Sequence, residues 1–302
     1  MTLATTIITT FNRMQFLRQA LASVLEQTEK KIQIIVMDNS STDGTQEFML
    51  QIRDPRVQYN RHRAMGIAEQ RNLGLNLAIG RYVGFLDDDD RWLAGKLRLQ
   101  LAAFSAAPPE VALVYGGFEF YNDEGKKWGG NTQKVQSDYY NNLLWARDPF
   151  TGSASNPLLR KDAVLAVGGY NEKIKVGEDW ELYVRLAKNY PFQRIEEKIL
   201  EIRQHTGRRL GDQVKSALQT EVHAYRLHLD QMNARQRSRF EQRIGGKLIR
   251  LNKNKLGQKL LKCAIKNNRL NLFAWAQLVL SLFPLNIYLY FHKKYLQSFK
   301  QH

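Results

Sequence analysis

Short apolar runs alternate with longer amphipathic stretches over the first part of this 302-residue chain. Residues 5–10 and 33–38 are rich in β-branched and apolar side chains, which is typical of buried strands. Between them, apolar side chains recur at helical spacing, which predicts a helix with one buried face. Those side chains are Phe16, Leu17, Ala20, Leu21, Val24 and Leu25.

The same alternation continues to residue 86. A helix is expected over 45–51, and Pro55 would end it because proline has no backbone N–H to donate. A strand at 57–60, a helix at 68–79 and a strand at 81–86 follow. This order predicts an α/β fold with a mostly parallel sheet flanked by helices. Ligands of such sheets bind beyond the carboxyl ends of the strands.

The net charge of the chain is concentrated in its last third. Residues 1–202 carry 25 basic and 25 acidic side chains, whereas residues 203–302 carry 20 basic and 4 acidic ones, a net charge of +16. This asymmetry predicts a neutral domain, 1–210, and a basic helical region, 211–302, with different partners.

An uncharged stretch rich in aromatic residues, 270–291, lies inside the basic region. Its length would just allow it to cross a bilayer. Basic residues flank it on both sides, however, and Pro284 would break a spanning helix. A kinked segment in the interface of an anionic membrane fits better; a true span and a soluble helical cap are the alternatives. No nucleic-acid-binding signature accompanies the charge, so nucleic acid is not expected as a partner.

Two simpler features bear on the compartment. The single cysteine, Cys263, excludes an internal disulfide framework and is typical of a reducing compartment. The first residues show neither a charged leader nor an apolar signal core. We therefore expect a cytoplasmic protein that is peripheral on the inner face of the cell membrane.

Four consecutive aspartates, 87–90, follow the strand at 81–86. Four carboxylates at one strand end repel one another unless a positive charge lies among them. Mg²⁺ or Mn²⁺ would supply it, because these cations take oxygen ligands and are often shared between one or two carboxylates and substrate phosphates. The alternatives are a solvated acidic turn or an N-cap for a helix that begins at Arg91, although a cap needs only one acid.

A parallel sheet with Asp38 at the end of its second strand would also suit a dinucleotide-binding protein. The phosphate loop of such proteins is missing, because residues 10–13 contain no glycine and no Walker loop occurs. The charge of a bound phosphate must then be met in another way, and a metal ion on the aspartates would do so.

Several blocks of sequence occur in order along the first two thirds of the chain. They are residues 6–13 (TIITTFNR), 36–45 (VMDNSSTDGT), 70–74 (QRNLG), 78–90 (AIGRYVGFLDDDD), 168–172 (GGYNE) and 177–182 (GEDWEL). Together they resemble family 2 glycosyltransferases, which have the Rossmann-like GT-A fold, use nucleotide sugars and invert the anomeric centre. The resemblance covers about residues 4–210, with the blocks in the expected order and spacing. Thr9 is a departure, because the family usually has proline there.

The resemblance implies roles for the residues that match on the donor side. Asp38 would accept a hydrogen bond from a uracil ring, and Arg71 would approach the base or phosphates from the loop before the fourth strand. Asp89 would be the main metal ligand of a D-x-D element that starts at Asp87, with the register open by one position. His205 would touch the diphosphate or complete the metal shell, although an ordinary loop histidine is an equal alternative. The implied nucleotide-binding residues are Thr10, Asn12, Arg13, Asp38, Arg71, Asp87 and Asp88.

The resemblance also implies a catalytic base, because inverting transfer needs one carboxylate to take the proton of the attacking hydroxyl. Asp179 matches this position, and Glu178 and Glu181 compete with it. Acids in the first turn of a helix also favour the positive end of its dipole, so a structural role is the alternative. Acceptor-side contacts are expected from Glu178, Trp180 and Trp128.

The sequence thus favours a metal-dependent inverting glycosyltransferase. A UDP-sugar would be the donor, and a saccharide or lipid-linked saccharide of surface polysaccharide or lipopolysaccharide synthesis the acceptor. A sugar nucleotidyltransferase is a second hypothesis, disfavoured because it needs a glycine- and arginine-rich loop after the first strand. A catalytically inactive scaffold that binds nucleotide sugars at the membrane is a third.

Overall fold

The structure is a computed structural model that describes residues 3–130, 138–146, 151–204 and 214–298. These residues form two compact units. The N-terminal unit comprises Met1–Lys173 and Glu178–Gly207, and the C-terminal unit comprises Ile174–Gly177 and Arg208–His302.

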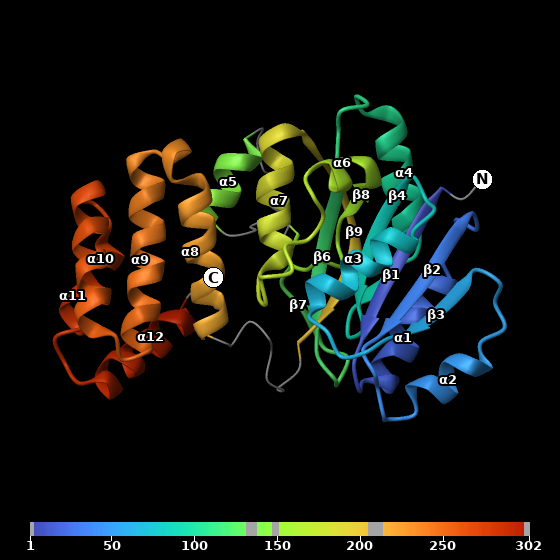
Figure 1. Ribbon diagram of the computed structural model, residues 1–302, viewed down its shortest axis with the longest axis horizontal. Coiled ribbons are helices and arrows are strands. Elements are labelled where there is room, and N and C mark those ends of the chain that lie inside the picture. Colours follow the sequence, from blue (N-terminus) through green and yellow to red (C-terminus); the bar gives the residue numbers. More distant parts are fainter. Residues whose placement is uncertain (1–2, 131–137, 147–150, 205–213, 299–302) are drawn as a thin grey trace. The chain divides into compact units, whose positions relative to one another are not determined.

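The N-terminal unit alternates strands and helices as far as β4, as the sequence predicts, and then becomes less regular (Figure 1). Its elements are β1 (Ala4–Thr10), α1 (Met14–Leu25), β2 (Ile32–Asp38), α2 (Thr45–Gln51), β3 (Val57–Arg61), α3 (Ile67–Leu77), β4 (Tyr82–Asp87), β5 (Arg91–Trp92), α4 (Lys96–Ala106), β6 (Leu113–Tyr121), β7 (Lys127–Trp128), α5 (Tyr139–Ala146), β8 (Leu158–Arg160), α6 (Lys161–Ala166), α7 (Glu178–Asn189) and β9 (Phe192–Arg203).

One sheet runs through this unit in the order β3-β2-β1-β4-β8-β6-β9-β5. The first four strands are parallel, as expected from the βα alternation. The other half is mixed, because β8 runs antiparallel to both β4 and β6, and β5 runs antiparallel to β9. In the same half, β6 and β9 pair in parallel. The α/β fold is therefore confirmed, with a sheet whose first half is parallel and whose other half is mixed.

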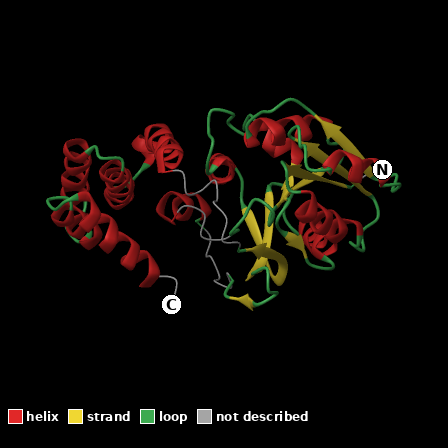
Figure 2. Ribbon diagram, turned by 90° about the horizontal axis from the view of Figure 1, so that it is seen from below, coloured by secondary structure: helices red, strands yellow, loops and turns green. Residues whose placement is uncertain are grey.

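Both faces of the parallel half are covered by helices (Figure 2). Ile7 and Ile8 point to opposite faces because side chains alternate along a strand, and both are fully buried. Ile8 belongs to a core shared with Leu17 and Val24 of α1. On the other face, Gly74 of α3 lies so close to Ile7 that a Cβ there would come within 2.6 Å of it. This packing fixes the strand ends at which the aspartates lie.

The aspartate run does not cap a helix, so that alternative is wrong. Arg91 and Trp92 form the short strand β5 instead, and α4 begins only at Lys96, after Gly95 with a φ of 79°. Trp92 is buried, and its Nε1 donates to the carbonyl of Ser155 at 2.8 Å. The turn that follows β4 is therefore held between β5 and the loop at 151–157.

The C-terminal unit is helical in its described part. A tight crossing of α9 and α10 lies at its centre, because a Cβ on Gly257 would come within 2.8 Å of the Gly245 carbonyl. Its small core combines Ile249, Leu261, Ala264, Ala274 and Tyr288. The helices are α8 (Val214–His228), a 3₁₀ turn (Leu229–Gln231), α9 (Ala234–Arg250), α10 (Asn254–Asn267), α11 (Leu272–Leu280) and α12 (Leu285–Ser298).

The uncharged stretch 270–291 is divided between two helices. α11 ends at Leu280, and α12 begins at Leu285, directly after Pro284, so the break expected from this proline is present. Across the residues that the structure describes, none of the helices is both long and apolar enough to cross a membrane.

Candidate active site

The carboxyl ends of β1 and β4 meet at one edge of the sheet, because these strands are parallel neighbours in which Thr9 lies opposite Asp87. Thr10 Oγ1 donates to Asp88 Oδ2 at 2.7 Å, and both residues are buried. Burial raises the pKa of Asp88 to about 7; the charge of Asp89 adds to this shift, and Arg13 opposes it.

Arg13 lies between two of the four aspartates. Its guanidinium is 3.3 Å from Asp88 Oδ1 and 3.0 Å from Asp89 Oδ2, and its side chain is 37% exposed. The Asp89 side chain is 18% exposed, three times the 6% of Asp88. Asp89 is therefore the more accessible of this pair, and an arginine provides the positive charge that the run requires.

The backbone of the run is held by residues that sequence reasoning missed. Tyr121 donates its hydroxyl to the Asp89 carbonyl at 3.1 Å, and Arg203 Nε donates to the same oxygen at 3.4 Å. Asp90 is buried and accepts from Ser153 Oγ at 2.7 Å and from the Arg203 backbone N–H at 3.2 Å. Burial raises the pKa of Asp90 well above its usual range. The one sequence signal for Arg203 is its position directly after the mostly apolar residues 199–202.

Arg71 connects the aspartate run with the candidate base. It lies on helix α3, not in the expected loop, and it is buried. One terminal nitrogen is 2.7 Å from Asp87 and the other 2.7 Å from Glu178. Tyr170 faces the guanidinium with its ring centroid 5.4 Å away. Arg71 therefore ties the end of β4 to the first residue of α7.

The acids at the start of α7 differ in their partners. Glu178 is held by Arg71, and Glu181 forms an ion pair with Arg185 at 2.7 Å. Burial raises the pKa of Glu178, and Arg71 opposes this shift. Asp179 is only partly buried, and Oδ1 accepts from the Trp180 backbone N–H at 2.8 Å. Among the described residues, no basic side chain forms an ion pair with Asp179.

Asp38 organises the loop after β2. It is fully buried; Oδ2 accepts from the Tyr59 hydroxyl at 2.5 Å and Oδ1 from the Ser41 backbone N–H at 2.9 Å. Asn12, with a φ of 51°, accepts from the Thr42 backbone N–H at 2.7 Å. A uracil ring could reach the Asp38 carboxylate only after a shift of this loop or of Tyr59. In this structure Asp38 and Asn12 therefore hold the loop after β2.

The acceptor-side residues are placed differently from one another. Trp180 is buried, and its Nε1 donates to the Leu143 carbonyl at 2.9 Å, so its ring packs in the core and offers no face to an acceptor. Glu178 is likewise buried and engaged by Arg71. Trp128 is 42% exposed at the end of β7, beside Phe120. His205 lies outside the described residues.

No group of three or more His, Cys, Asp or Glu residues converges in residues 3–130, 138–146, 151–204 and 214–298. Asp87 and Asp89, 34% and 18% exposed, are partly accessible hard oxygen donors at the end of β4. Such a pair could hold a cation that is shared with substrate phosphates.

These observations agree with the comparison to known proteins. The family model described as Glycosyl transferase family 2 matches residues 5–168, more than half of the chain. The chain belongs to glycosyl transferase family 2. The match covers the aspartate run, Arg71 and the strands as far as β8, but ends before α7 and β9.

Two curated relatives of family 2 are 32% identical to the chain. One is UDP-Glc:alpha-D-GlcNAc-diphosphoundecaprenol beta-1,3-glucosyltransferase WfgD of Escherichia coli, matched over 47% of this chain and 55% of that protein. The other is GalNAc(5)-diNAcBac-PP-undecaprenol beta-1,3-glucosyltransferase of Campylobacter jejuni, matched over 62% of this chain and 60% of that protein. An uncharacterized glycosyltransferase of Rickettsia felis is matched over 32% of its length. The chain therefore spans about a third to three fifths of the length of these three relatives.

Solved structures of similar fold include TarS from S. aureus with UDP-GlcNAc, at 16% identity and a TM-score of 0.59, covering 89% of this chain and 74% of that one. A second is the mannosyltransferase PcManGT from Pyrobaculum calidifontis with GDP-Man and Mn²⁺, at 19% identity and a TM-score of 0.57, covering 95% and 84%. At these identities the likeness shows the fold, which is the GT-A type.

Proposed function

We propose that this chain transfers a sugar from a nucleoside diphosphate sugar to an acceptor hydroxyl, with inversion at the anomeric carbon. The observation that carries the proposal is the Arg71 bridge. It ties Asp87 at the end of β4 to Glu178, the residue directly before the partly exposed Asp179. A donor-binding edge and a candidate base therefore belong to one connected group of residues.

Asp179 is proposed as the base. It accepts the acceptor hydroxyl proton while that oxygen bonds to the anomeric carbon and the bond to the diphosphate breaks. A base must have a carboxylate oxygen that can take a proton, and the arginine partners of Glu178 and Glu181 make both less suited to this role. The leaving nucleoside diphosphate carries the electron pair of the broken bond.

A divalent cation, Mn²⁺ or Mg²⁺, fits the donor set at the end of β4. Asp89 and Asp87 would hold it. When bound, the cation supplies electrostatic stabilisation of the charge that develops on the diphosphate. Arg13 now pairs with Asp89, so we propose that this arginine turns to the donor phosphates when the cation is bound.

The donor is proposed to be a UDP-sugar. Support comes from the WfgD relative, whose name specifies UDP-Glc, and from Asp38 at the end of β2. Thr10 donates a hydrogen bond to Asp88, which would face the ribose of the donor. Asn12 accepts from the backbone of the loop at 41–42, against which the base would lie.

The acceptor is proposed to be a lipid-linked saccharide used in surface polysaccharide synthesis, because both relatives described above are named for undecaprenol-linked acceptors. Such an acceptor lies in a membrane. We therefore also propose that the chain acts as a peripheral protein on the cytoplasmic face, with Trp128 near the acceptor sugar.

A screen of nucleotide sugars tests this function. Release of the nucleoside diphosphate is measured for UDP-, GDP- and dTDP-sugars, with Mn²⁺, with Mg²⁺ and with chelator. We expect turnover with one class of donor, UDP-sugars, and only when metal is present. Pyrophosphate release from a nucleoside triphosphate and a sugar phosphate would support the nucleotidyltransferase instead. Donor binding without turnover in the presence of lipid-linked acceptors would support the scaffold.

A further inference from the structure

Helix α11 is apolar on its outer surface as well as its inner one. Ala274 is fully buried in the core of the C-terminal unit, yet Leu272, Trp275 and Val279 are 74%, 46% and 52% exposed. The turn that follows continues this surface, since Leu282 is 73% and Phe283 50% exposed. A helix at a water-facing surface normally carries polar residues there, so an exposed patch of this kind marks an interaction site. These five residues, Leu272, Trp275, Val279, Leu282 and Phe283, are the apolar face.

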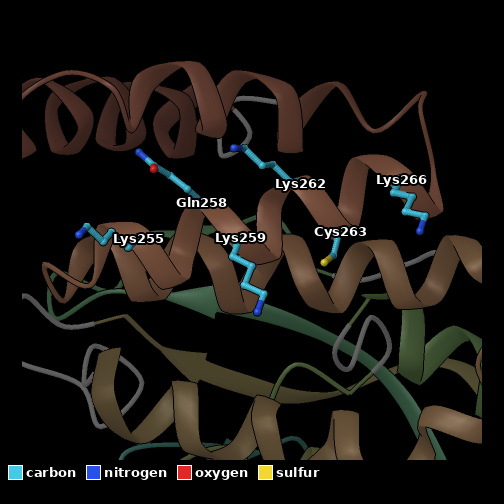
Figure 3. Close-up of a pocket in the computed structure, with 6 residues that line it drawn as sticks. All are labelled: Lys255, Gln258, Lys259, Lys262, Cys263 and Lys266. Atoms are coloured by element: carbon cyan, nitrogen blue, oxygen red, sulfur yellow. The ribbon is translucent and has the colours of Figure 1, made fainter.

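Helix α10 carries a row of lysines beside this face. Lys255, Lys259, Lys262 and Lys266 are exposed and recur at intervals of four, three and four residues, which places them on one side of the helix. That side is opposite Leu261 and Ala264, which face the core. The four lysines line a pocket of about 420 Å³ together with Gln258 and Cys263 (Figure 3). Lys255, Lys259, Lys262 and Lys266 are called the lysine row.

The lysine row has no acidic counterpart in its own helix, because α10 contains neither aspartate nor glutamate. The ion pairs found in the described part of the C-terminal unit join Glu221 to Arg243 and Lys247, and none involves the lysine row. Four like charges on adjacent turns of a helix repel one another. The row therefore presents uncompensated positive charge to a ligand.

Hydrogen bonds hold the two features beside each other. Gln258 lies on α10 directly before Lys259, and its Nε2 donates to the Ser281 carbonyl at 3.2 Å. Ser281 directly precedes the exposed Leu282. Gln242 of α9 donates to Gln277 of α11 at 2.9 Å, and Asn271 donates to Ser238 at 2.9 Å. The lysine row and the turn of the apolar face are thus part of one packed body.

We propose that the apolar face enters the interface of an anionic phospholipid bilayer while the lysine row binds the lipid phosphates. Charge complementarity selects this occupant. A second copy of the chain offers its own lysines and no negative charge from α10, and nucleic acid would leave the apolar face in water. The proposal deepens the membrane location given under the proposed function, but it does not depend on catalysis.

Vesicle sedimentation with the full chain tests the proposal, with vesicles of phosphatidylcholine alone or mixed with phosphatidylglycerol. Binding is expected only to the anionic vesicles and should weaken as salt rises, because salt screens surface charge. Lys259→Gln with Lys262→Gln should lower the partition coefficient by about thirtyfold, from roughly 1 kcal/mol per charge near the surface. The matched control, Lys31→Gln with Lys188→Gln, removes two exposed lysines of the N-terminal unit and should change nothing.

The apolar face has its own readout. Fluorescence from Trp275 should be quenched by brominated lipid in the wild type, and Trp275→Phe should remove that quenching while binding persists. Leu272→Ser with Val279→Ser should reduce binding to anionic vesicles.

Equal binding to both vesicle types, or equal partition of the lysine variant and its control, would overturn the proposal. Self-association that the serine variant abolishes, without vesicle binding, would assign the face to a second copy. A failed donor screen would leave all these outcomes unaffected.

Discussion

Asp179→Asn is expected to lower kcat by about 10²–10⁴-fold, the usual contribution of a positioned general base. The amide has the size of the carboxylate, and its oxygen can still accept from the Trp180 backbone N–H. The first turn of α7 should therefore keep its structure. Nucleotide affinity should be unchanged, because the residue is proposed to act on the acceptor hydroxyl. Initial rates at saturating donor and acceptor, with calorimetry of UDP binding, measure the two effects separately.

Glu181→Gln is the comparison variant for this role. Glu181 lies two residues further along α7 and is held by Arg185, so the substitution changes a carboxylate of the same turn that has a structural partner. It should lower stability more than the rate of the folded enzyme. A rate loss with Glu181→Gln and full activity of Asp179→Asn would move the base to Glu181.

Arg71→Met should destabilise the N-terminal unit by about 3–5 kcal/mol, the usual cost of removing one partner of a buried ion pair. The substitution keeps most of the side-chain volume but leaves the buried Glu178 and the partly buried Asp87 without their counter-charge. Urea unfolding, followed by the fluorescence of the buried Trp92 and Trp180, measures the loss.

The double variant Arg71→Met with Glu178→Gln separates charge from packing. It should recover part of the stability, because the buried side chain at position 178 then carries no charge. Arg63→Met is the matched surface control, since the Arg63 side chain is 86% exposed; its effect should stay within about 0.5 kcal/mol. An Arg71→Met protein as stable as this control would show that the bridge does not hold β4 and α7 together.

Local pattern predicted the parallel half of the fold well. The strand at 33–38 and the helix at 45–51 were expected from apolar runs and from Pro55, and both are present. The mixed half could not be predicted in this way. β8 has only three residues and β5 only two, and each is a strand because a longer neighbour pairs with it. Such segments have too few residues to show a period.

The residue types of the site could be read from the sequence, but their pairings could not. Arg71 and Glu178 are 107 positions apart and meet only through the tertiary fold. Arg203, whose side chain lies against the Tyr121 ring and bonds the Asp89 carbonyl, carries no local motif. Trp180 was expected as an acceptor contact because its sequence block, 177–182, resembles an acceptor-side block of the family. Neighbours in a helix point in different directions, however, and this side chain is buried in the core.

We propose that the aspartates at the end of β4 bind a donor diphosphate through a divalent cation. Calorimetric titration of UDP into the wild type and into Asp89→Asn, each with Mn²⁺ and with chelator, separates this binding mode from a metal-free one. Mn²⁺ should strengthen binding to the wild type at least tenfold, about 1.4 kcal/mol, and should have no effect on the variant. Absence of UDP binding by the wild type in both buffers, or equal metal dependence of the two proteins, would overturn the proposed metal-mediated binding.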